Sequence, residues 1–112
     1  TRPVVLDNPS TAIEIRLTSN IRSDAEVEVY FRATSSEEAR DVKDLNWVPF
    51  NGNGSEDTTV APAESNSEFK EYKYSAKGLT EFTAFQIKIA MKGTNSAHAP
   101  RIKDLRGIAL AV

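Results

Sequence analysis

The side chains that could coordinate a metal ion gather in one polar segment. Five of them carry oxygen atoms: Asn51, Asn53, Ser55, Glu56 and Asp57. The glycines between them permit tight turns, and Ca²⁺ prefers oxygen-rich loops of this kind. The spacing departs from the helix–loop–helix calcium pattern, because the glycine and the terminal bidentate glutamate of that pattern are misplaced. We therefore interpret the segment as a surface loop and expect no metal and no other cofactor.

Residues suited to acid–base or nucleophilic catalysis are few. The chain has no cysteine and one histidine, His98, which has no partner nearby in sequence and is expected in an exposed loop. Glu26 and Glu28 share a strand face, and paired carboxylates hydrolyse glycosides when they flank a cleft. A solvent-facing sheet surface explains this pair more simply. The chain also lacks a nucleophile elbow, a phosphate loop and a zinc signature. We therefore expect that the protein is not an enzyme.

Four aromatic side chains are candidates for a binding surface: Tyr30, Trp47, Tyr72 and Tyr74. On the outer face of a sheet they could stack against sugar rings, as in carbohydrate-binding β-sandwiches, or mark a protein interface. Alternatively, Trp47 closes the core and the tyrosines lie at its rim. Carbohydrate binding by Trp47 and surface tyrosines therefore remains an alternative function.

Charge is unevenly distributed along the chain. The net charge is −2, from 14 basic and 16 acidic side chains, which is not typical of a nucleic-acid-binding protein. Residues 35–68 carry eight carboxylates against two bases, and residues 86–112 carry five bases against one carboxylate. These segments are either solvated loops and strand edges or surfaces that attract one another between neighbouring subunits. No apolar run has the length that a membrane helix needs, so we expect no membrane partner.

Alternation of apolar and polar residues predicts the secondary structure. Strands are expected over residues 11–18, 25–34, 69–75, 82–92 and 102–112. Pro49 reduces the stretch before the polar loop to an edge strand or an extended arm. Ser35 and Ser36 ahead of Glu37 predict a helix of one or two turns. The alternation of the last strand slips at Gly107, which predicts a β-bulge there.

These elements predict a single all-β domain over residues 1–112. Two sheet faces buried against each other make a β-sandwich, with one short helical segment and a long acidic loop over residues 51–68. The length suits one domain. A first residue other than methionine, Thr1, and an apolar end favour a fragment of a longer protein, expected to be its C-terminal part.

Two stretches of the chain resemble a known group of proteins. VEVYFRATSSEEARDVKDLNWVPFN (27–51) and FTAFQIKIAMKGTNSAHAPRIKDLRGIALA (82–111) resemble the end of large structural proteins of contractile-tailed phages, especially marine cyanophages. Those proteins look like tail or baseplate components. The segment GTNSAHAPRIKDLRGIAL also resembles the closing strands of galactose-binding-like jelly rolls. The resemblance covers roughly half of the chain and brings no catalytic residues.

The resemblance implies a non-enzymatic structural domain of jelly-roll type. Its work would be protein–protein contact within a phage tail or baseplate, in a virion assembled in the host cytoplasm, where a cysteine-free chain fits. The implied partners are other virion subunits, with self-association open and no nucleic acid. The expected contact surface consists of Trp47, Phe50, Arg101, Lys103 and Arg106.

Overall fold

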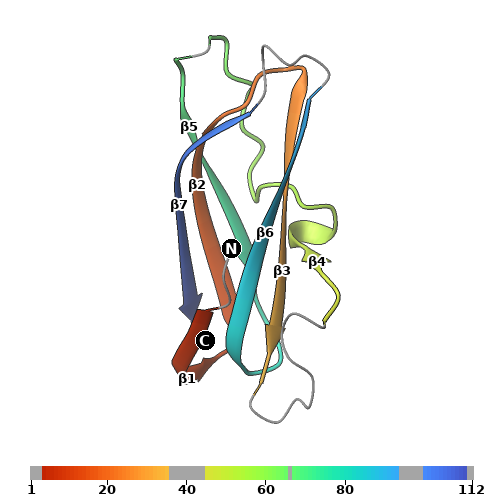
Figure 1. Ribbon diagram of the computed structural model, residues 1–112, viewed down its shortest axis with the longest axis vertical. Coiled ribbons are helices and arrows are strands. Elements are labelled where there is room, and N and C mark those ends of the chain that lie inside the picture. The colour runs from red at the N-terminus through yellow and green to blue at the C-terminus, as the bar shows by residue number, and fades with distance from the viewer. Residues whose placement is uncertain (1–3, 36–44, 66, 94–99, 111–112) are drawn as a thin grey trace.

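The structure is a computed structural model that describes residues 4–35, 45–65, 67–93 and 100–110 (Figure 1). The short helix predicted around Glu37 and the histidine His98 lie outside the described residues. Within them, strands predominate, and the long strands run along the longest dimension of the molecule, 46 Å. The all-β prediction is therefore confirmed.

Two antiparallel sheets contain all seven strands of the described residues. The four-stranded sheet has the order β1-β6-β3-β4, formed by β1 (Val4–Ser10), β6 (Phe82–Gly93), β3 (Ala25–Thr34) and β4 (Val48–Pro49). The three-stranded sheet has the order β5-β2-β7, formed by β5 (Lys70–Ala76), β2 (Ala12–Asn20) and β7 (Arg101–Leu110). The one helical element in the described residues is the 3₁₀ turn η2 (Phe50–Gly52).

One apolar core lies between the two sheets. Because side chains alternate between the faces of a strand, every second residue of each long strand points inward. The buried residues of this core come from both sheets and from η2: Ile13, Ile15, Leu17, Val27, Val29, Phe31, Phe50, Tyr72, Tyr74, Phe82, Phe85 and Ile87. The arrangement is therefore sandwich-like, as the alternation predicts.

Phe50 is part of this core. Its side chain is 0% exposed, and its ring centroid lies 4.9 Å from that of Phe31 and 6.0 Å from that of Tyr74. The turn η2, which begins directly after Pro49, places the ring between the sheets. The prediction of Phe50 as a contact residue is therefore wrong, because the ring is inaccessible to a partner.

The tyrosines of β5 are also core residues. Tyr72 is 3% exposed and Tyr74 is 0% exposed. In contrast, Glu71 before them and Lys73 between them face solvent. Burial raises the pKa of the Tyr74 hydroxyl far above its ordinary value. Neither ring can stack against a sugar, so the alternative that counts these two tyrosines among the surface aromatics is wrong.

The bulge of β7 lies elsewhere than predicted. The register of β7 on β2 skips Lys103, whereas Gly107 pairs regularly with Ile15. A Cβ added to Gly107 would lie 3.0 Å from Ile15 Cδ1, so the glycine leaves room for that side chain. The apolar alternation breaks here because the inward-facing residues Gly107 and Ala109 are small. The strand has no extra, unpaired residue at Gly107, so there is no bulge at that point.

Candidate contact surfaces

The loop after η2 closes one long side of the sheet pair. The Val29 backbone amide of β3 donates a hydrogen bond to the Gly54 carbonyl (3.0 Å). Three residues further on, the Asp57 amide donates to the Lys73 carbonyl of β5 (2.7 Å). The loop thus satisfies backbone groups at an edge of each sheet, which is one way that proteins cover exposed edges.

Asp57 fastens this loop to β5 through its side chain as well. Its carboxylate accepts hydrogen bonds from the Ser75 amide (3.0 Å), from the Ser75 hydroxyl and from Asn51 Nδ2 (2.9 Å). Partial burial raises the pKa of Asp57, but the hydrogen bonds from Ser75 and Asn51 outweigh that effect and the pKa lies below its ordinary value. In the described residues, no group of three or more His, Cys, Asp or Glu side chains is placed to hold a metal ion.

Replacing Asp57 with asparagine is expected to destabilise the domain by about 1 kcal/mol at neutral pH, because charged hydrogen bonds weaken. Since the pKa is lower in the folded state, the carboxylate stabilises the fold above the pKa of the unfolded chain. That contribution disappears as the pH falls through the folded-state pKa. Urea unfolding at pH 7 and at about pH 2 should show a gap between Asp57→Asn and wild type that closes in acid. Glu64→Gln, on the same loop, is the control, and an Asp57→Asn gap of equal size at both pH values would contradict the assignment.

The opposite long side of the sheet pair is bordered by β1 and β7. Among the described residues, β7 pairs with β2 on one edge and with no strand on the other (Figure 1). Eight large apolar side chains of the described residues are exposed, and five belong to these two strands: Val4, Val5, Ile102, Ile108 and Leu110. Ile108 and Leu110 lie two residues apart on β7, and neighbouring exposed apolar side chains favour an interaction surface. We call this side of the molecule the β1–β7 side.

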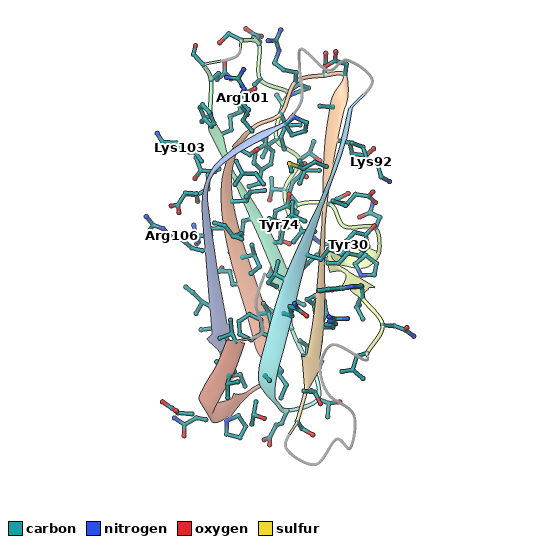
Figure 2. The ribbon with its side chains drawn as sticks, in the orientation of Figure 1. Tyr30, Tyr74, Lys92, Arg101, Lys103 and Arg106 are labelled. Carbon is teal, nitrogen blue, oxygen red and sulfur yellow. The ribbon has the colours of Figure 1, made fainter. Side chains whose placement is uncertain are left out.

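The three predicted cationic contact residues all lie on β7 and are exposed (Figure 2). Arg106 Nε contacts Asp104 Oδ2 on the same strand at 3.0 Å. The Lys103 ammonium lies 5.8 Å from the centroid of the Phe69 ring. The structure therefore gathers Arg101, Lys103 and Arg106 on the edge strand of the three-stranded sheet.

Trp47 belongs to a different surface, on the four-stranded sheet. The Arg32 guanidinium lies 4.1 Å from its ring centroid, and the Lys88 ammonium lies 5.6 Å from it. The same ammonium lies 5.1 Å from the Tyr30 ring centroid. Arg32 Nε and Nη2 both donate to Gln86 Oε1, at 2.9 and 2.6 Å, which fixes the guanidinium. Two of the four predicted aromatic side chains thus share a row of cation–π contacts.

The carboxylate of Glu28 lies on the same strand, β3, as Tyr30. It contacts the Lys92 ammonium at 2.5 Å and accepts a hydrogen bond from the Tyr30 hydroxyl at 3.2 Å. The hydrogen bond from Lys92 lowers the pKa of Glu28, against the opposing effect of burial. Lys88 and Lys92 both lie on β6 of the four-stranded sheet, whereas the other cations of the basic segment lie on β7 of the three-stranded sheet. The basic segment 86–112 is thus divided between the two sheets and does not form one surface.

A small cavity of about 240 Å³ lies where the β2–β3 turn meets the loop after η2. Polar residues of its wall include Arg22, Glu26 and Glu56. Its volume falls below the range of typical small-molecule sites, about 300–1,000 Å³.

No protein-family model, curated protein or solved structure matches the chain. Among the described residues, no helix is long and apolar enough to cross a bilayer. Two surfaces are therefore the candidates for a functional contact: the β1–β7 side and the row around Trp47.

Proposed function

We propose that this chain is a non-enzymatic protein-contact domain of a phage tail or baseplate protein that acts in the virion. The observation that carries the proposal is the β1–β7 side, where β7 has one edge that no strand of the described residues pairs with, beside exposed apolar side chains. The resemblance of residues 27–51 and 82–111 to structural proteins of contractile-tailed phages supports the assignment to a phage virion. Strand β7 lies within the second of these stretches.

The order of the strands supports a jelly-roll type of sandwich. In the three-stranded sheet β2 pairs with β7, the last strand, and in the four-stranded sheet β3 pairs with β6, the strand before it. Nested antiparallel pairs of this kind arise when one long double strand rolls up, as in jelly rolls. Strands β1 and β4 then extend the four-stranded sheet, one on each side of its central pair, and β5 extends the three-stranded sheet.

The contact itself would combine exposed apolar side chains with charged ones. Ile108 and Leu110, at 47% and 41% exposure, supply area that a partner would remove from water. The exposed cations of β7 would guide an approaching partner and fix its orientation more than they would add affinity. No step of this function requires a catalytic residue.

The direct test is the composition of the particle. Peptides of this chain are expected in mass spectra of density-purified virions of the phage that encodes it, in a fixed ratio to the tail proteins. Intact virions that lack these peptides would overturn the proposal.

Carbohydrate binding is the second candidate, favoured by the row of Tyr30, Lys88 and Trp47. A glycan array probed with the intact protein tests it. Trp47→Ala should abolish any signal, whereas Val48→Ala, at the adjacent exposed position, should keep it. Absence of binding at millimolar sugar would remove this candidate.

A further inference from the structure

The charges on either side of Leu105 in β7 are opposite in sign. Asp104 precedes this residue and Arg106 follows it. When a strand pairs antiparallel with its own copy, residues at equal distances on either side of the centre lie opposite one another. Centred on Leu105, such a pair places each Asp104 opposite the Arg106 of the other copy.

We propose that β7 pairs antiparallel with β7 of a second copy of this chain, centred on Leu105. The result is a continuous six-stranded sheet across the two copies. This inference rests on the proposed role as a protein-contact domain and names one partner for it.

The side chains at the centre suit this register. The Asp104 and Arg106 side chains are 46% and 76% exposed, so each can reach an opposite charge across the new pair. Cross-strand pairs of opposite charge stabilise a sheet, and like charges in the same positions destabilise it. Lys103, the bulge residue, falls opposite Gly107, which has no side chain to obstruct it.

Two of the other strand edges are poorly suited to adding a further copy. After β7 pairs, the outer edges of the six-stranded sheet are the two copies of β5. Each is covered by the Asp57 amide and carboxylate, bonded to Lys73 and Ser75. In the four-stranded sheet, the edge strand β4 has two residues, one of them Pro49. Because both copies use the same β7 edge, the contact is closed and two-fold, rather than an open ladder of copies.

Sedimentation velocity over a range of protein concentrations tests the pairing. Wild type should show a reversible monomer–dimer equilibrium. Asp104→Arg and Arg106→Asp should each weaken the dimer by about tenfold or more, because each places like charges opposite one another twice. The double variant, Asp104→Arg with Arg106→Asp, restores opposite charges and should return the dimer. Circular dichroism melting curves of the three variants check that the exposed substitutions leave the domain folded.

Two outcomes would overturn the pairing. One is a wild-type chain that stays monomeric at every concentration, and the other is a dimer that both single variants leave unchanged. Neither outcome bears on the presence of the chain in virions, so the failure of this inference is distinguishable from failure of the proposed function.

Discussion

Replacing Phe50 with alanine is expected to lower the free energy of unfolding by about 3–5 kcal/mol, the usual cost of removing a fully buried phenylalanine. The ring fills the space between the sheets and contacts Phe31 and Tyr74. Because Phe50 comes from the turn η2 rather than from a long strand, its loss should also loosen the loop that covers the edge of β5. Urea denaturation followed by circular dichroism measures the change.

Trp47→Ala is the matched control for Phe50→Ala. The tryptophan lies three residues earlier and is half-buried, with the Arg32 and Lys88 contacts on its ring. Its removal should cost about 1–2 kcal/mol. Equal costs for the two substitutions would contradict the placement of Phe50 in the core and of Trp47 on the surface.

Gly54→Ala is expected to destabilise the domain by about 2–4 kcal/mol, because two effects combine at this position. The backbone φ of Gly54 is +86°, a conformation that side chains rarely adopt. An added Cβ would also lie 2.8 Å from Glu28 Cβ and 3.2 Å from the Val29 amide nitrogen. Since these atoms belong to β3, the loop would have to move away from the sheet edge.

Gly52→Ala separates these two effects. Its φ is +80°, but nothing lies within 4 Å of the added Cβ. It should therefore cost only the conformational strain, about 1 kcal/mol. Thermal unfolding of both variants makes the comparison. A Gly54→Ala variant no less stable than Gly52→Ala would show that the loop does not press against β3.

The strands could be predicted from sequence because their cause is local. In β3 the inward residues Val27, Val29 and Phe31 alternate with polar ones, and the predicted bounds, 25–34, agree with the structure. On β5 the pattern was ambiguous, because Lys70 shares a face with Tyr72 and Tyr74. The buried face was set by the opposite sheet, which a single strand pattern does not contain.

The contact surface was predicted only in part, because it too depends on how the strands are arranged in the two sheets. The cations of β7 are exposed, as predicted, but whether they join Trp47 depends on the order of strands in the two sheets. That order places β7 beside β2 and β4 beside β3. Phe50 was misplaced because Pro49, directly before it, indicated an edge strand or an extended arm. One feature of the sequence indicates the exposed surface of β7. Ile108 faces outward, whereas the inner face of the strand carries the small residues Gly107 and Ala109.

One strand edge, that of β7, is the proposed contact surface of this domain. Because the chain contains no cysteine, a single introduced cysteine reports on that contact directly. In the proposed pair the two copies of Leu105 lie opposite each other, at a separation that a disulfide can span. Mild oxidation of Leu105→Cys, read on a non-reducing gel, should therefore give a covalent dimer. Lys77→Cys, exposed beyond the end of β5, should remain monomeric, and a Leu105→Cys variant that gives no more dimer than Lys77→Cys would contradict the account.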